Sequence, residues 1–232
     1  MAWTQRTELL VGGDRLRAYA TAHVLLVGTG GVGAFVAEFL ARAGLGSITL
    51  VDGDVVSETN RNRQLLALCS TEGQAKVEVL RQRLMDINHD MSVIVRQQWI
   101  NTDNVQTLFE DTHYQFVVDA IDDVPAKCAL LKYCVENGVP VVAAMGAAGK
   151  YDPSLIQLSD ISKSHHCPLA KAVRKRLLQD GINTGIPVVF SPEPADLTHH
   201  SASPGVRTVP GTLSYMPAAF ACHISAYVLS KL

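Results

Sequence analysis

The sequence has few cysteines, and no two of them form a C-x-x-C pair. The five cysteines are scattered along the 232 residues, at positions Cys69, Cys128, Cys134, Cys167 and Cys222. A structural zinc site built from paired cysteines is therefore excluded. Single, scattered cysteines suit reduced thiols in a cytosol.

Long hydrophobic runs are also absent. No stretch reaches the roughly 18 uninterrupted apolar residues that a membrane span needs, and the opening segment Met-Ala-Trp-Thr-Gln-Arg has no apolar signal core. The most apolar late stretch, Met216 to Leu229, is short and contains His223, so we expect a buried or dimer-interface helix there. We therefore predict a cytoplasmic protein with no integral membrane association.

An excess of positive charge is missing as well. The formal net charge is −2 and the isoelectric point is about 6.4. Any contact with nucleic acid therefore has to come from a local basic surface. A hydrophobic content of 47% with 18% charged residues indicates a well-packed globular protein, and no internal repeat or low-complexity segment interrupts it.

The sequence does contain a regular alternation of strand-like and helix-like segments. Periodicity and turn residues predict strands at 23–28, 47–51, 92–97, 115–119 and 139–144, and helices at 14–20, 32–43, 73–87, 102–110 and 124–137. Strands that alternate with helices of this length form parallel crossover units. The sequence therefore predicts an α/β protein with a Rossmann-like, doubly wound and mostly parallel sheet.

The pattern changes after residue 146. Strands at 155–158 and 188–190 flank a helix at 168–180, and a loop at 191–211 precedes a last strand at 212–215 and the final apolar helix. We expect the loop to be mobile because it is long and has no periodicity. We predict a nucleotide-binding portion over residues 1–146 and a smaller α/β portion over 147–232 that continues the same sheet.

A glycine-rich turn joins the first predicted strand to the next helix. Gly28, Gly30, Gly31 and Gly33 directly follow an apolar run, and Asp52 ends the second strand. Backbone N–H groups of such a turn and the positive end of the helix bind phosphate, and an acid about 20 residues further on reaches a ribose hydroxyl. The turn and the acid together predict a nucleotide site.

Polar and basic side chains continue beyond this acid. They are Asp54, Asn60, Arg63, Gln64 and Lys76. A dinucleotide site needs little more than the acid, whereas Arg63 and Lys76, on either side of an irregular segment, suit a triphosphate. We therefore predict ATP, with cations and Mg²⁺ stabilising the negative charge that builds up when a carboxylate attacks the α-phosphorus.

Three aspartates stand at or just after the end of the fourth predicted strand. Ligands in open parallel sheets bind beyond the carboxyl ends of the strands, so Asp119 and Asp122 are expected to face the same crevice as the glycine turn. Asp122 and Asp123 also precede Val124-Pro125, which has the composition of a helix start. One of these two is expected to cap the helix, and we favour Asp122 as the ligand of a nucleotide-bound Mg²⁺.

The ordered set of motifs resembles the adenylating superfamily of ubiquitin-activating enzymes and their bacterial relatives. The set comprises R-T-E-L-L from Arg6, G-x-G-G-V-G, V-D-x-D, N-x-x-R-Q, Lys76 and D-A-I-D. Within the superfamily the chain is most similar to the tRNA threonylcarbamoyladenosine dehydratases. That similarity rests on R-T-E-L-L-V-G at 6–12, G-A-A-G-x-x-D-P at 146–153, V-F-S-x-E-P at 189–194 and Y-M-P-A from Tyr215.

This resemblance implies ATP-dependent activation of the threonyl carboxylate of threonylcarbamoyladenosine in tRNA, followed by ring closure with loss of water. It also implies a role for six side chains: Asp52 at the ribose, Asn60, Arg63 and Lys76 at the phosphates, Asp122 at Mg²⁺, and Arg6 at the phosphates of the neighbouring subunit's ATP. An arginine supplied by a neighbour implies a homodimer. A monovalent cation and a sulfur-relay protein partner are left open.

One departure bears on the choice between relatives. Activators of sulfur-carrier proteins typically hold zinc in two C-x-x-C pairs and use a nucleophilic cysteine in the second half, and this chain lacks the pairs. We interpret Cys167 as a loop thiol, because a nitrogen already tethered to the activated carboxylate needs no enzyme thioester. Adenylation of the C-terminus of a ubiquitin-like sulfur-carrier protein is the alternative function. A silent nucleotide-binding scaffold and a nicotinamide dehydrogenase explain the residues less well.

The predicted helix at 168–180 has a basic stripe formed by Lys171, Arg174 and Lys175. An apolar stripe is expected on another side of the helix, formed by Leu169, Ala172, Val173 and Leu177. Two interpretations of the basic stripe stay open: a solvated face over a core stripe, or a contact with tRNA phosphates.

Overall fold

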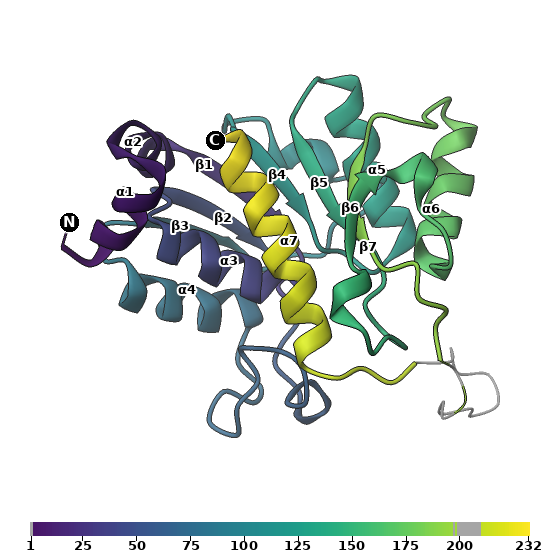
Figure 1. Ribbon diagram of the computed structural model, residues 1–232, viewed down its shortest axis with the longest axis horizontal. Coiled ribbons are helices and arrows are strands. Elements are labelled where there is room, and N and C mark those ends of the chain that lie inside the picture. The colour runs from purple at the N-terminus through teal and green to yellow at the C-terminus, as the bar shows by residue number, and fades with distance from the viewer. Residues whose placement is uncertain (1, 197, 199–209) are drawn as a thin grey trace.

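The computed structural model of the protein describes residues 2–196, 198 and 210–232. Its centre is a seven-stranded sheet in the order β3-β2-β1-β4-β5-β7-β6 (Figure 1). The strands are β1 His23–Val27, β2 Ser47–Val51, β3 Ser92–Arg96, β4 Phe116–Asp119, β5 Val141–Ala144, β6 Gln157–Asp160 and β7 Pro187–Phe190. Neighbouring strands are parallel except β6 and β7, which are antiparallel. The doubly wound, mostly parallel sheet predicted from the sequence is confirmed, and it continues across residue 146.

Helices cover both faces of the sheet. They are α1 Gln5–Val11, α2 Gly13–Thr21, α3 Gly33–Ala43, α4 Lys76–Ile87, α5 Val124–Glu136, α6 Pro168–Gln179 and α7 Tyr215–Lys231. Short 3₁₀ turns occur at Ala2–Thr4, Glu58–Asn60, Val105–Leu108, Pro153–Leu155 and Ile161–Lys163. Figure 1 shows α1 and α2 at the end of the molecule farthest from α6. Within the described ranges, no helix combines the length and hydropathy of a membrane span.

Two apolar cores lie on the two faces of the sheet. Val24 and Leu26 of β1 pack into the core formed with α3, α4 and α7, whereas Leu25 and Val27 pack into the core formed with α5 and α6. This is the period-two alternation of a strand whose two faces are both covered. It explains why the central strands are continuous apolar runs in the sequence.

The glycine turn packs closely against the segment that follows β4. A Cβ atom on Gly33 would lie 1.8 Å from the carbonyl oxygen of Gly28, and one on Gly28 would lie 2.6 Å from that of Ala120. Gly28 also has a φ of +92°, a conformation that glycine adopts without strain. The approach of these backbones brings the turn and Asp122 to one edge of the sheet.

Side-chain hydrogen bonds explain two differences from the predicted elements. The helix expected at 102–110 is only the 3₁₀ turn Val105–Leu108, because the Asn101 carboxamide accepts from the backbone of Asp103 and Asn104 just before it. The strand expected at 155–158 forms two residues later because Asp152 caps the turn Pro153–Leu155.

The strand expected at 212–215 does not form, and α1 was missed. Gly211 and Thr212 use their carbonyl groups to accept from Gly149 N and the Asn62 side chain, so they are paired with loops instead of the sheet. Helix α1 has no buried residue, so no apolar periodicity marks it. Helix α4 begins at Lys76 rather than residue 73, and most of the 191–211 loop lies outside the described residues.

A buried ion pair fixes the segment after β4. Lys127 Nζ lies 2.9 Å from Asp119 Oδ2, and both side chains are fully buried. Lys127 Nζ also donates to the carbonyl of Ile121 at 2.9 Å, while Asp119 Oδ1 accepts from the backbone N–H of Ile121 at 3.0 Å. Burial raises the pKa of the Asp119 carboxyl, and the neighbouring Lys127 ammonium opposes that rise.

We predict that Lys127→Met lowers the free energy of unfolding by about 3 kcal/mol or more, because it leaves a buried carboxylate without its counter-charge. Urea denaturation followed by circular dichroism measures the change. The double variant Lys127→Met/Asp119→Asn removes that charge and is expected to recover part of the loss. Equal stability of wild type and the single variant would contradict a structural role for the pair.

Candidate active site

A cavity of about 730 Å³ opens at the carboxyl ends of the central strands. Its walls come from the glycine turn, the segments after β2, β3 and β4, the end of β5 and the start of α7. Both its volume and its position beyond the strand ends, next to the reversal of strand order between β1 and β4, are typical of a nucleotide site.

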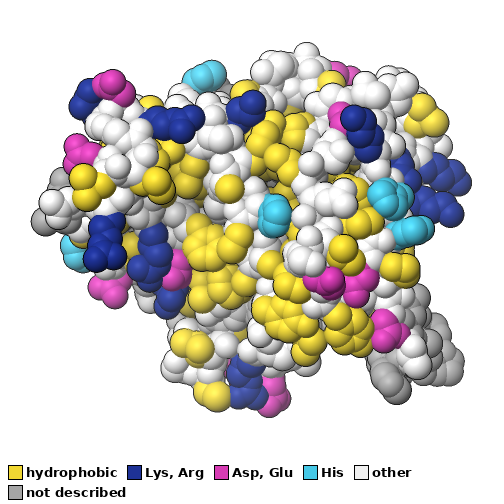
Figure 2. Space-filling view, viewed as in Figure 1, with side chains coloured by type: hydrophobic (Ala, Val, Ile, Leu, Met, Phe, Trp, Pro, Cys, Tyr) yellow, Lys and Arg dark blue, Asp and Glu magenta, His cyan; other side chains and the backbone are white. Residues whose placement is uncertain are grey.

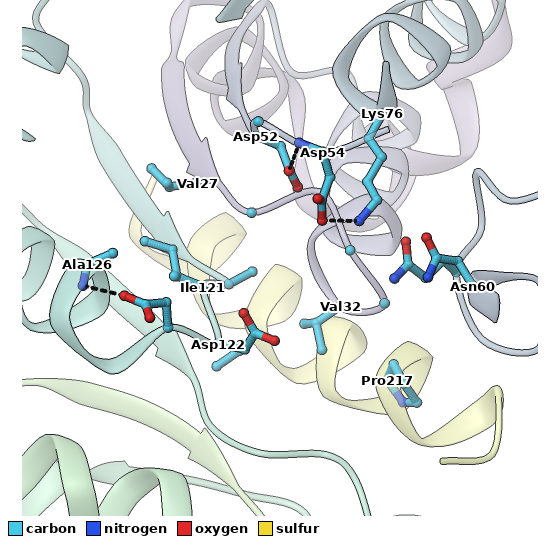
Figure 3. Close-up of a pocket in the computed structure, with 18 of the residues that line it drawn as sticks. Val27, Val32, Asp52, Asp54, Asn60, Lys76, Ile121, Asp122, Ala126 and Pro217 are labelled. Carbon is cyan, nitrogen blue, oxygen red and sulfur yellow. Dashed lines mark hydrogen bonds and ion pairs between the residues drawn. The ribbon is translucent and has the colours of Figure 1, made fainter. Parts of the chain in front are cut away.

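Polar and apolar side chains both line the cavity. Figure 3 shows Lys76 and Asn60 on one side and Ile121 and Ala126 on the other, with Asp122 between them. The predicted residues Gly28, Gly30, Gly31, Asp52, Asp54, Asn60, Arg63, Gln64, Lys76 and Asp122 all line this cavity. Gly33 does not line the cavity. It is the first residue of α3 and packs against the backbone carbonyl of Gly28 in the turn.

Asp52 organises the backbone around the glycine turn. Its Oδ2 accepts from the backbone N–H and the hydroxyl of Thr29 at 2.7 and 2.9 Å, and its Oδ1 accepts from Asp54 N at 2.9 Å. A carboxylate has about four acceptor positions, so these three bonds leave one for a ligand hydroxyl. The predicted ribose contact is compatible with this geometry and stays a prediction.

Lys76 is the most enclosed cation of the cavity. It is the first residue of α4, its side chain is 6% exposed, and its Nζ lies 2.7 Å from Asp54 Oδ2. Asp54 also accepts the Lys76 backbone N–H through its carbonyl at 3.0 Å. An ammonium group bonded to a single carboxylate oxygen has further donor capacity for phosphate oxygens.

The 3₁₀ turn Glu58–Asn60 and the residues after it present the other polar groups. Asn60 Oδ1 accepts from Ser57 N, which closes a capping box and orients the amide. Arg63 is half-buried and held by Thr59 O at 2.9 Å and Asn62 Oδ1 at 2.8 Å. Gln64 Oε1 is buried and has no hydrogen-bond partner in the described part of the chain.

The three aspartates at and after the end of β4 have separate roles. Asp123 caps α5 by accepting from Ala126 N at 3.0 Å, so Asp122 is left exposed at the cavity, as the sequence predicted. The expectation that Asp119 faces the crevice is wrong: its carboxylate is buried against Lys127. Within the described ranges no three His, Cys, Asp or Glu side chains form a metal cluster, so any Mg²⁺ at Asp122 would share its other ligands with phosphate and water.

Four predicted functional residues lie away from the cavity lining. Arg6 is exposed on α1, and Lys171 and Lys175 are exposed on α6. Arg174 is half-buried, because its guanidinium donates to the carbonyl and the hydroxyl of Ser164. The apolar face of α6 consists of Ala170, Val173 and Leu177, whereas Ala172, predicted to lie on it, is exposed.

Cys167 is not the polar loop thiol that the sequence predicted. It is 4% exposed, and its Sγ caps α6 by accepting from Ala170 N at 3.5 Å. A Cβ on Gly146 would lie 3.5 Å from this sulfur, so the glycine gives it room beneath the cavity wall. The histidines before it had suggested exposure, but the residue directly before a helix is also a capping position.

Sequence reasoning missed several cavity residues. Gln98 and Trp99 follow β3, Leu169 lies on α6, and Thr212 and Pro217 come from the end of the chain. A Cβ on Gly31 would lie 3.3 Å from Pro217 Cβ, so the start of α7 closes the cavity beside the glycine turn. Only Gln98 and Trp99 had a sequence signal, namely their position just beyond the carboxyl end of a strand.

The residues that are present fit ATP. Gly30 faces open space, with only Gln64 Nε2 within 4 Å of a Cβ built there, so its backbone is accessible to a phosphate. Lys76 and Arg63 supply positive charge beside it. The side chains of Gln64 and Gln98 also line this cavity, although their atoms Gln64 Oε1 and Gln98 Nε2 are themselves buried and have no hydrogen-bond partner among the described residues.

Comparison with known proteins gives the family. Residues 4–232 match the ThiF family. The chain belongs to that family. It is 44% identical to the tRNA threonylcarbamoyladenosine dehydratase of Bacillus subtilis (81% of this chain, 74% of the relative) and 43% identical to that of Escherichia coli (83% and 75%).

A solved structure extends this likeness over the whole ThiF-family chain. The crystal structure of E. coli tRNA N6-threonylcarbamoyladenosine dehydratase, TcdA, in complex with ATP aligns with a TM-score of 0.90 at 39% identity. The alignment covers 99% of this chain and 94% of that one. The family resemblance inferred from the motifs is confirmed.

Proposed function

We propose that the protein is an ATP-dependent tRNA threonylcarbamoyladenosine dehydratase. The observation that supports this most is the convergence of Lys76, Arg63, Asn60 and Asp122 on one cavity, in a ThiF-family chain whose relatives include dehydratases of that name. The substrate carboxylate attacks the α-phosphorus of ATP and pyrophosphate leaves. The tethered nitrogen then attacks the activated acyl carbon and AMP leaves, so the oxygen lost from the substrate departs on AMP.

The cavity residues act on charge and position in this scheme. Lys76 and Arg63 donate to phosphate oxygens and stabilise the charge that develops on the transferring group and on pyrophosphate. Asp122 and the phosphates would hold Mg²⁺, which would supply further positive charge when bound. Among the described residues we identify no site for a monovalent cation and no surface for a sulfur-relay partner. Neither takes part in the proposed reaction.

A homodimer is part of this proposal. Arg6 lies outside its own cavity, on a helix with no buried residue whose Leu9 and Leu10 are 81% and 85% exposed. Apolar side chains this exposed are typical of an interface. A two-fold dimer would cover them and carry Arg6 to the cavity of the partner.

We also place the protein in the cytoplasm, in keeping with its five free cysteines.

The alternative, adenylation of a sulfur-carrier protein followed by transfer to an enzyme thiol, is less well supported. Cys167 is buried, and burial raises the pKa of Cys128 to about 11 and of Cys134 to about 12. The exposed thiols Cys69 and Cys222 do not line the cavity. A thiolate nucleophile beside the activated carboxylate is therefore missing among these residues.

The product identifies the reaction. With ATP, Mg²⁺ and tRNA that carries threonylcarbamoyladenosine, we expect the modified nucleoside to become lighter by one water, measured by mass spectrometry under conditions that preserve the ring. Lys76→Ala is expected to keep the fold and lower the rate about 100-fold or more, because it removes charge from the phosphates. The control Lys132→Ala, on the exposed face of α5, should react normally. An unchanged nucleoside mass with adenylation of a Gly-Gly protein terminus would favour the alternative.

Subunit mixing tests the shared site. Arg6→Ala and Lys76→Ala are each expected to be inactive, yet a mixed dimer has one cavity with both residues. Random exchange makes about half of the dimers mixed, so activity should return to about a quarter of the wild-type value. Arg15→Ala, an exposed arginine of α2, serves as the control and should be active alone. Inactivity after verified exchange would argue against a contribution of Arg6 across the dimer.

The basic surface of α6 tests the tRNA contact. Figure 2 shows Lys and Arg side chains gathered at the end of the molecule formed by α6. Removing Lys171, Arg174 and Lys175 together should raise the KM for tRNA and lower the slope of log K against log salt by about 1 per lost phosphate contact, with ATP binding unchanged. Arg174 also donates hydrogen bonds to Ser164, so its removal changes both charge and structure. The double variant Lys171→Ala/Lys175→Ala removes charge alone. If this double variant has the wild-type KM for tRNA and the wild-type salt slope, the tRNA contact is contradicted and the basic stripe is a solvated face.

A further inference from the structure

Two adjacent histidines, His165 and His166, are exposed just before the start of α6. Nδ1 of His165 lies 3.1 Å from the carbonyl oxygen of Lys163, and Nδ1 of His166 lies 2.9 Å from that of Pro192. A carbonyl oxygen can only accept, so each Nδ1 carries the proton that it donates. Within the described ranges neither Nε2 has a hydrogen-bond partner, so the outer end of each exposed ring is available to a ligand.

The backbone of His166 is held in an uncommon conformation. Its φ is +52°, in the left-handed region that residues with a Cβ seldom adopt, so contacts around it have to hold it there. Nζ of the buried Lys150 donates to the carbonyl oxygen of His166 at 3.3 Å, and the ring itself bonds to Pro192. The ring of His165 packs edge-on against His166 and against the buried Phe190. Both imidazoles are therefore oriented before any ligand binds.

The two rings have no carboxylate partner among the described residues. On the segments that adjoin them, Glu193 accepts from the backbone N–H groups of Tyr151 and Asp152, and Asp196 accepts from the Tyr151 hydroxyl. The cations of these segments are Lys150, Lys163, Lys171 and Arg174, and Lys150 and Arg174 are bonded to backbone carbonyl groups. A proton taken up by either ring therefore adds positive charge to a surface that is already basic.

The histidines lie between the basic stripe of α6 and the cavity. The exposed Lys171 follows them in the first turn of α6, and Leu169, between them, lines the cavity. The buried thiol of Cys167, directly after His166, packs against Gly146 of the cavity wall. Figure 2 shows histidine side chains beside the Lys and Arg side chains at this end of the molecule. A polymer that runs from the basic stripe to the cavity would thus pass over both rings.

We propose that His165 and His166, when protonated, bind backbone phosphates of the tRNA next to the nucleotide that enters the cavity. The inference rests on the proposed tRNA substrate. An imidazolium donates through Nε2 to a phosphate oxygen, whereas a neutral ring with its proton on Nδ1 presents a lone pair at Nε2 and cannot. Histidine changes its charge between pH 5 and pH 8, so the protein should hold RNA more tightly at the acidic end of this range.

An unmodified transcript of the tRNA used in the activity assay measures binding without the reaction. In fluorescence anisotropy without ATP, we expect the wild type to bind about 3- to 10-fold more tightly at about pH 6 than at about pH 8, as for two exposed ionic contacts. The slope of log K against log salt should steepen by about 0.7 for each added phosphate contact. The double variant His165→Gln/His166→Asn should lose this gain and keep the affinity of the wild type at about pH 8. Asparagine suits position 166 because it tolerates a positive φ.

Two further variants separate charge from structure. The matched control is His89→Gln, an exposed histidine after α4, which should keep the gain at low pH. His165→Lys carries a charge that does not titrate in this range, so it should raise the affinity at about pH 8 and reduce the dependence on pH. Circular dichroism verifies that each variant is folded.

The binding and activity measurements fail independently. If the double variant gains affinity at low pH as the wild type does, or if His165→Lys binds no more tightly than the wild type at about pH 8, the inference is overturned. The proposed function still stands in that case if the wild type forms the nucleoside that is lighter by one water. If no such product forms while RNA binding depends on the histidines and on pH, the RNA contact stands and the proposed function fails.

Discussion

The close approach of the glycine turn to the segment after β4 is the constraint on which the rest of the site depends. Neither Gly28 nor Gly33 has room for a Cβ, because the carbonyl groups of Ala120 and Gly28 occupy that space. This contact places the start of α3 beside the loop that carries Asp122. The glycine turn and the loop that carries Asp122, far apart in the sequence, are thereby brought together by backbone packing rather than by side-chain contacts.

A buried ion pair holds the loop after β4 in place against the turn. It does so by bonding the backbone polar groups of the loop. Asp119 and Lys127 are fully buried, and between them they bond both the N–H and the carbonyl of Ile121. Buried pairs of this kind often add little net stability, but they orient what they bond. The strand-end aspartate that the motif D-A-I-D supplies is thus structural, and the next acid along, Asp122, is the one at the cavity.

Sequence reasoning succeeded where local chemistry decides the outcome. The glycine turn, Asp52 and Lys76 could be placed because strand, turn and helix signals are adjacent in the chain, and the division of Asp122 and Asp123 followed from helix capping. It failed for groups whose environment is set by distant contacts. Nothing near Asp119 reveals the burial of Lys127 against it, and nothing near Cys167 reveals that Gly146 leaves room for its sulfur. Thr212 and Pro217 reach the cavity only because α7 crosses back over α3.

The side chains that line the cavity carry more negative than positive charge. Four carboxylates line it, from Asp52, Asp54, Asp122 and Asp123, against two cations, Arg63 and Lys76. Asp54 already neutralises Lys76 at 2.7 Å, and Asp52 and Asp123 are engaged by backbone donors. A strongly anionic ligand in such a site needs positive charge from elsewhere, since like charges in a partly enclosed space repel. In the proposed reaction, Mg²⁺ at Asp122 would bring positive charge with the nucleotide, and Arg6 of a second subunit would bring it with the dimer. An acidic cavity that receives its additional positive charge from a metal ion and a second subunit would thus bind the triphosphate productively only when every component of the reaction is in place.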